Sequence, residues 1–241
     1  MWRATGQPGQ GAIPAAAAAC NNTLLGCLGL SQQVLPKTSY VTYLEAATSN
    51  AAMSLELHDR IAHMGGLSGV LATAQMVGID ISTMLASNNV AARIGDANYS
   101  DIIWWLEWYT ATGATVVTAT IAVTYHDGTT GTITVSLPAT RPAGHAISLN
   151  GLIPAAGAGK YIRAVNTVTL SASSGTAGSF GVTATRLRAT LGCPIANFKW
   201  TANVYDLGMP EISANSCIFP MLLTSTSSSG TIRAQGKISN G

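Results

Sequence analysis

The chain has 241 residues, of which 47% are hydrophobic and only 9% are Asp, Glu, Lys or Arg, whereas soluble domains usually contain about 25% charged residues. Its net charge of +2, from 12 basic and 10 acidic residues, is too small to hold a nucleic-acid backbone, so nucleic acid is not expected as the main partner. The sequence has no run of about 18 apolar residues, and a membrane span is therefore not expected.

Low charge with abundant Ala, Gly, Ser and Thr is typical of a subunit whose surface largely faces other protein. A globular β protein rich in small residues would have the same composition, so composition alone does not separate these two interpretations.

Residues 1–38 are rich in Gly, Pro, Gln and Ala and lack periodicity, which predicts an extended N-terminal arm that stays loose or orders on a neighbouring molecule. The AAAAAC stretch ending at Cys20 resembles an export cleavage site. Gly, Gln and Pro stand where an unbroken apolar region would be needed, so export by this segment is not expected.

The cysteines form no CxxC pair and have no His nearby at zinc-ligand spacing, so we expect free thiols and no metal site. They are Cys20, Cys27, Cys193 and Cys217. A bridge between Cys20 and Cys27 stays open.

Residues 39–100 are expected to form a helix followed by a long connector. The stretch 42–64 is compatible with a helix that Gly65 and Gly66 would end. Its imperfect apolar stripe comprises Leu44, Met53, Leu57, Ile61 and Met64.

Three residues of this stretch, His58, Asp59 and His63, form the most enzyme-like cluster of the sequence. Asp59 and His63 are four residues apart and would share a helix face. No third ligand or nucleophile accompanies them, so a structural side-chain pair at a helix end is favoured over catalysis.

From Ile102 onward, strand-like segments recur with turn signals between them. This pattern predicts a mainly β protein with an antiparallel β-sandwich or jelly-roll-like body over residues 101–223. The last segment, residues 224–241, has two cations and no acid and is expected to form a second extended arm.

An aromatic block lies in the first predicted strand of this body. Trp104 and Trp108 share one face of the strand, whereas Trp105 and Tyr109 lie on the other. Aromatic side chains on both faces imply that both faces are covered. We favour a core on one side and a subunit interface on the other, with a sugar-stacking platform as the alternative.

Residues 117–137 predict a β-hairpin, because apolar residues alternate with Thr on both sides of an Asp127-Gly128 turn signal. The outer face, which includes Thr120 and Thr134, has hydroxyl and methyl groups where solvated strands usually carry Lys, Glu or Arg. We therefore expect this face to meet other subunits.

The remaining candidates for chemistry are weaker. His126, Asp127 and His145 lie in predicted loops without a recognisable nucleophile motif, and GGLSG at 65–69 does not fit G-x-S-x-G. The Gly-rich segments 154–160 and 175–181 lack phosphate-loop spacing and are predicted to be tight strand connections. We expect no catalytic residues and no cofactor.

Three segments together resemble a group of tailed-bacteriophage virion proteins: LELHDRIAHMGGLSG at 55–69, WLEWYTATGATVVTATIAVTYHDGTTGT at 105–132, and KYIRAVNTVTLSASSGTAGSFGVTATRL at 160–187. The resemblance covers about residues 40–190 and is one of texture and order. The N-terminal arm and the region after Leu187 depart from the pattern.

The resemblance implies a non-enzymatic structural component of a phage particle, assembled in the host cytoplasm. It favours a capsid decoration or cement protein that contacts the major capsid protein or other virion subunits as a homo-oligomer, with a trimer as our expectation. Placement in the tail, neck or fibres is the nearest alternative.

Two alternatives come from other classes. A glycan-binding module would use Trp105, Trp108 or Tyr109 as stacking platforms, and a hydrolase would use His58 or His63 with a nucleophile that the sequence does not reveal.

Overall fold

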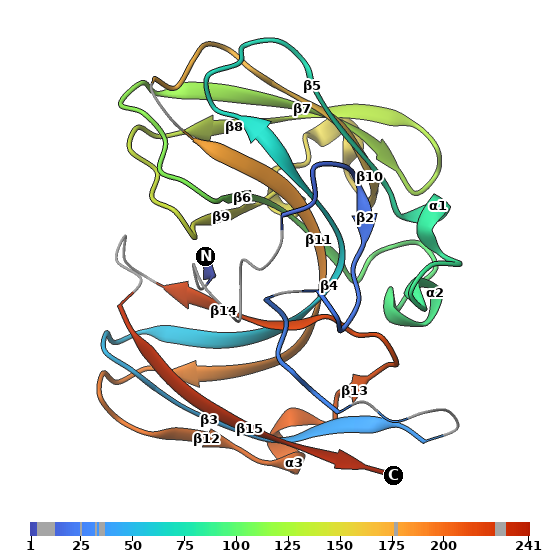
Figure 1. The fold of residues 1–241 in the computed structure, drawn as a ribbon, viewed down its shortest axis with the longest axis vertical. Coiled ribbons are helices and arrows are strands. Elements are labelled where there is room, and N and C mark those ends of the chain that lie inside the picture. Colours follow the sequence, from blue (N-terminus) through green and yellow to red (C-terminus); the bar gives the residue numbers. More distant parts are fainter. Residues whose placement is uncertain (4–12, 25, 32, 34–36, 176–177, 225–229) are drawn as a thin grey trace.

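The computed structural model describes residues 1–241 except 4–12, 25, 32, 34–36, 176–177 and 225–229. The protein is mainly β, with antiparallel strands in three sheets and a few short helices (Figure 1). Within the described part of the chain, no helix is long and apolar enough to cross a membrane.

The central sheet contains the two longest strands of the protein. Its order is β1 (Trp2–Arg3), β14 (Ile218–Thr224), β4 (Met53–Ser68), β11 (Ser179–Cys193), β6 (Ile102–Trp108) and β9 (Ala146–Ser148), and β2 (Ala18–Ala19) also pairs with β4. Figure 1 shows β4 and β11 curving from one end of the molecule towards the other, so these two strands reach both of the remaining sheets.

The upper sheet lies at one end of β4 and β11, and the lower sheet lies at the other (Figure 1). The upper sheet has the order β5 (Gln75–Asp80), β10 (Ile162–Leu170), β7 (Val117–Tyr125) and β8 (Thr130–Leu137). In the lower sheet, β3 (Ser39–Thr48) pairs with β12 (Trp200–Ala202), β13 (Glu211–Ile212) and β15 (Ile232–Asn240).

Short helices occur in the connections. The α-helices are α1 (Ile81–Met84), α2 (Val90–Arg93) and α3 (Val204–Leu207), and the 3-10 turns are η1 (Asn150–Leu152) and η2 (Ala155–Gly157).

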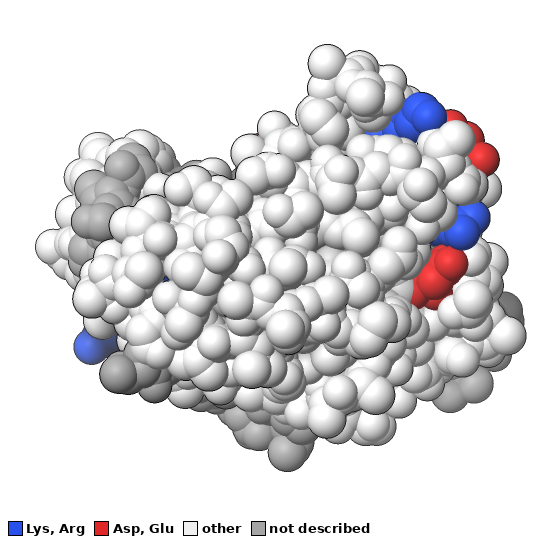
Figure 2. All heavy atoms as spheres, turned by 90° about the horizontal axis from the view of Figure 1, so that it is seen from above, with Lys and Arg blue, Asp and Glu red and all other residues white. Residues whose placement is uncertain are grey.

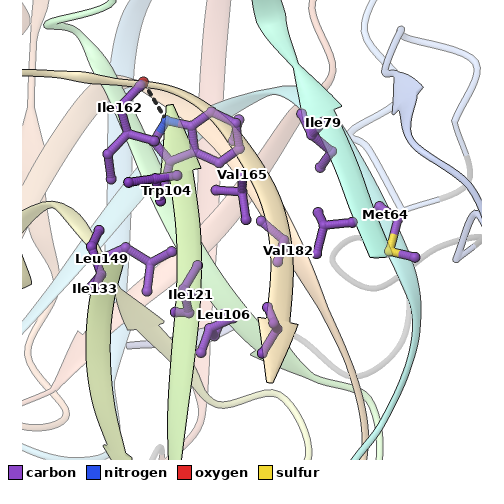
Figure 3. Packing of buried hydrophobic residues seen from close by; sticks show 14 of the residues in the cluster. Met64, Ile79, Trp104, Leu106, Ile121, Ile133, Leu149, Ile162, Val165 and Val182 are labelled. Atoms are coloured by element: carbon purple, nitrogen blue, oxygen red, sulfur yellow. Dashed lines mark hydrogen bonds between the residues drawn. The ribbon is translucent and has the colours of Figure 1, made fainter. Parts of the chain in front are cut away.

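Two large hydrophobic clusters form most of the core. The larger one joins the upper sheet to the facing part of the central sheet; Figure 3 shows Ile121 of β7 and Val165 of β10 in this cluster together with Trp104 and Leu106 of β6. The smaller one joins β3 of the lower sheet to the other halves of β4 and β11. This packing explains the alternating pattern of the hairpin 117–137, because every second residue of each strand is apolar and is buried in the larger cluster.

The helix predicted for residues 42–64 is wrong, because these residues form β3, a turn and most of β4. β4 lies between β11 and β14, and β11 pairs with it from Met53 to Ser68. The register shifts near Ile61 and near Gly65, and side chains of both parities are buried along residues 57–64. Apolar residues on both faces of a strand, with shifts of phase between them, imitated a helical spacing.

Described parts of both predicted arms pair within the chain. β1 pairs with β14, β2 pairs with β4, and β15 pairs with β3 along nine residues. The remainder of the arms at 4–12, 25, 32, 34–36 and 225–229 lies outside the described residues. The predicted boundaries at residues 38, 100 and 223 stay predictions.

Candidate functional site

The aromatic block of β6 is buried on both faces by the chain itself. Trp104 and Trp108 lie in the larger hydrophobic cluster, and the Trp104 indole N–H donates to the Ile162 carbonyl at 2.8 Å (Figure 3). On the opposite face, Trp105 is 6% exposed and Tyr109 is 7% exposed. These rings present no open surface on which a sugar ring could stack.

Phe219 and Met221 of β14 pack together with Trp105 on this opposite face of the central sheet. The Trp105 indole N–H donates to the Thr185 hydroxyl at 2.8 Å, and the Tyr109 hydroxyl is 3.2 Å from Nε2 of His63. The predicted role of the aromatic block at a subunit interface stays a prediction, and a partner would meet the segments that cover these rings.

The predicted cluster of His58, Asp59 and His63 lies on β4, where it belongs to a buried polar network. Asp59 receives two hydrogen bonds from the Arg93 guanidinium, at 3.0 and 2.6 Å. Arg93, from α2, also donates to the backbone carbonyls of Cys20, Asn88 and Arg60. These bonds fasten α2 to the central sheet.

Glu107 of β6 is the second centre of this network. The Arg60 guanidinium lies 3.3 Å from Glu107, and Nδ1 of His63 lies 3.4 Å from it. Arg60 also stacks over the Phe219 ring, with 4.3 Å from its guanidinium carbon to the ring centroid. His63 further contacts the Thr183 hydroxyl. Charges that pair in this way satisfy one another, which is what a buried network needs to be stable.

His58 completes the polar face of β4. Its Nδ1 is 3.1 Å from the Thr185 hydroxyl, and its Nε2 is 2.9 Å from the Glu56 carboxylate. His58, Asp59 and His63 are each fully buried, so no substrate could reach them in this conformation. Within the described residues, no group of three His, Cys, Asp or Glu side chains could hold a metal ion.

Sequence reasoning missed the other charged members of this network, which are Arg60, Arg93 and Glu107. One signal for Glu107 was present, because a lone carboxylate inside the aromatic strand IIWWLEWYT has to find a buried partner. Nothing in the sequence indicated that the partners come from β4.

The other histidines lie in the connections. His126 and Asp127 lie in the turn between the two strands of the hairpin. There the Asp127 carboxylate forms an ion pair with Lys160 at 2.9 Å and accepts a hydrogen bond from the Thr129 N–H at 3.0 Å. Hydrogen bonds from Thr129 and Lys160 hold the pKa of Asp127 below its ordinary value. Burial, reinforced by the nearby Arg141 cation, lowers the pKa of His145 to about 3.

An apolar cavity of about 490 Å³ lies between the lower sheet and the central sheet. Ala234 and Gly236 lie opposite buried residues of β3, and they are too small to fill the space beneath β15. Leu55 and Leu57 of β4 form the opposite wall. The cavity has the size of a small-molecule site, but neither His58 nor His63 lines it.

The outer surface of the upper sheet is rich in hydroxyl groups. Thr120 and Thr134 are exposed and lie directly opposite each other in the β7–β8 register, and Thr169 of β10 is opposite Thr120 on the other side. We call this surface the threonine face; it comprises Thr118, Thr120, Thr124, Thr132, Thr134, Ser136, Thr167 and Thr169.

Charge is nearly absent from the threonine face. Among the residues of β5, β7, β8 and β10, only Asp80 and Arg163 are charged, and they pair with each other at 3.3 Å. Figure 2, which looks down on the end that holds the upper sheet, shows few charged side chains, gathered mostly along one border. Met76 of β5 lies opposite Thr167 and is 69% exposed, so an apolar side chain adjoins the hydroxyl groups.

The comparisons with known proteins give no family for this chain: no family model, no curated protein and no solved structure matches it.

Proposed function

We propose that the protein is a non-enzymatic structural subunit of a tailed-bacteriophage particle, acting as a capsid decoration or cement protein through its threonine face. The observation that carries this proposal is the exposed, almost charge-free sheet surface around Thr120 and Thr134. The resemblance of residues 40–190 to phage virion proteins supports the class of particle.

The chemistry of the threonine face suits contact with protein. Burying a charged side chain requires a partner, whereas a Thr methyl can pack and its hydroxyl can donate or accept at a small desolvation penalty. Protein interfaces are depleted in charged residues at their centres, as this face is. The partner would be the major capsid protein or another virion subunit, and the protein itself would form a homo-oligomer, for which we propose a trimer.

We also propose that the paired layers form a β-sandwich. The two hydrophobic clusters support this class, because each one lies between the central sheet and one outer sheet. A rigid layered body would hold the threonine face flat against a partner.

The test is the copy number of this chain in purified particles, measured by quantitative mass spectrometry against the major capsid protein. Copies comparable in number with capsid subunits are expected for a decoration protein. A small number would move the protein to the tail, neck or fibres, and its absence from particles would overturn the proposal.

Variants then test the threonine face itself. Thr120→Lys and Thr134→Glu should each lower the copy number per particle, because each places an unpaired charge in the contact. Tyr205→Lys is the matched control, since Tyr205 of α3 is 91% exposed and lies outside this face. Equal incorporation of all three variants would show that the threonine face is free in the particle.

A further inference from the structure

Two cysteines that are 190 positions apart in the sequence, Cys27 and Cys217, lie side by side in the fold. The Leu28 N–H donates to the Ile218 carbonyl at 2.6 Å, so the residues that directly follow the two cysteines are hydrogen-bonded to each other. The Cys217 thiol is also hydrogen-bonded to the Cys27 sulfur. Both cysteines are free thiols.

The surroundings give the two thiols different properties. Cys27 is partly exposed, its thiol donates to the Asn22 carbonyl at 3.0 Å, and the hydrogen bond from Cys217 lowers its pKa to about 7. A lowered pKa favours the thiolate, which is the form of cysteine that attacks disulfides. Cys217 is buried, and the same hydrogen bond together with burial raises its pKa. Its backbone is fixed as well, because its N–H donates to Asp59 at 2.8 Å and its carbonyl accepts the Arg60 N–H at 2.9 Å.

We propose that Cys27 and Cys217 are a modification site that reacts with small-molecule disulfides, such as oxidised glutathione, to form an internal disulfide bond. The Cys27 thiolate attacks one sulfur of oxidised glutathione, which forms a mixed disulfide and releases one glutathione thiolate. The Cys217 sulfur then attacks the Cys27 sulfur, its proton passes to the departing second glutathione, and the bridge closes. Two protein thiols are oxidised, and one glutathione disulfide is reduced to two glutathione thiols.

The bridge would tie the N-terminal segment to the central sheet. Leu28 and Ile218 both line the apolar cavity, so the bond would also fix this wall of the cavity. Closing a loop of this length restricts the unfolded chain, and the oxidised protein should therefore be more resistant to unfolding. The inference concerns the thiols alone and stands whether or not the protein belongs to a virion.

The test uses the full-length protein, incubated with reduced or oxidised glutathione and analysed by intact mass and peptide mapping without reduction. The oxidised wild type should lose the mass of two hydrogen atoms, yield a Cys27–Cys217 linked peptide, and melt at a higher temperature than the reduced protein. Four free thiols, a glutathione retained on Cys27, or a Cys20–Cys27 peptide would each overturn the proposal.

Two variants separate the roles of the thiols. Cys217→Ala should stop the reaction at the mixed disulfide, so this variant should keep one glutathione on Cys27, whereas Cys27→Ser should gain none. Cys193→Ala, which removes another buried thiol on β11, should still form the bridge. Because a buried substitution can impair folding, alkylation rates of the reduced wild type provide a second measurement: Cys27 should react fastest, and equal rates for all four thiols would contradict the proposed order of attack.

Discussion

The Asp59–Arg93 pair shows how individual residues are held in this protein. Both side chains are almost completely buried, and each is satisfied several times by side-chain or backbone groups. A buried charge that loses its partner keeps its full desolvation penalty, whereas an exposed charge is simply hydrated again. The structure therefore depends much more on this pair than on the ion pairs at the surface.

We predict that Arg93→Met lowers the free energy of unfolding by about 3–5 kcal/mol, because it leaves the Asp59 carboxylate buried and unpaired. Urea unfolding followed by circular dichroism measures this change. Lys160→Met, which removes the partly exposed partner of Asp127, should have little effect. Equal effects of the two substitutions would contradict a structural role for the buried pair.

At this scale the sequence revealed only half of the polar network. His58, Asp59 and His63 drew attention because three polar groups stand within six positions. Their partners Arg93 and Glu107 are more than thirty positions away, and spacing along the chain has no bearing on contacts that only sheet pairing creates. The cysteine pair was hidden for the same reason.

The packing around strand β11 differs between its two ends. Near its start, a Cβ atom built at Gly181 would meet the Tyr109 hydroxyl and the Met64 carbonyl at 2.2 and 2.3 Å. Near its end, a Cβ at Gly192 meets nothing within 4 Å. The first glycine lets β4 and β6 approach β11 closely, and the second has no such role.

We predict that Gly181→Ala lowers the free energy of unfolding by about 1–3 kcal/mol, the range typical of overpacking. Gly192→Ala on the same strand should leave stability unchanged or raise it slightly, because it restricts the unfolded chain. Thermal unfolding of the two variants beside the wild type gives the comparison. A similar loss for both would mean that chain entropy, and not the close approach, decides the outcome.

The sequence predicted elements well where a strand buries one face and poorly where it buries two. The hairpin 117–137 is confirmed, because its Thr residues face outward and the Asp127-Gly128 turn closes it. The sequence predicts a helix where β4 lies, because neighbouring strands and the register shifts, which are invisible in the sequence, determine which residues of β4 are buried.

For the whole molecule, the decisive feature is that β4 and β11 belong to both hydrophobic clusters. Neither half of the fold has its own complete set of strands. If one cluster loses its packing, the strands that support the other lose their alignment, so the two halves should unfold together.

We predict a single calorimetric transition whose van't Hoff and calorimetric enthalpies agree. Leu55→Ala in the smaller cluster and Ile121→Ala in the larger one should each lower the stability of that one transition by about 2–5 kcal/mol. Leu71→Ala, at a residue that is 49% exposed, is the control. Two transitions, with each variant shifting a different one, would show that the halves fold independently.

Burial of the Asp59, Arg60, Arg93 and Glu107 side chains also affects how copies of the protein meet in solution. These four charges cancel within the network, and the whole chain has a net charge of only +2, so little electrostatic repulsion keeps copies apart. Added salt has correspondingly little to screen. Association between copies at high protein concentration therefore depends on the shape complementarity and the hydration of their hydroxyl-rich surfaces. Changing the ionic strength should have little effect on this association.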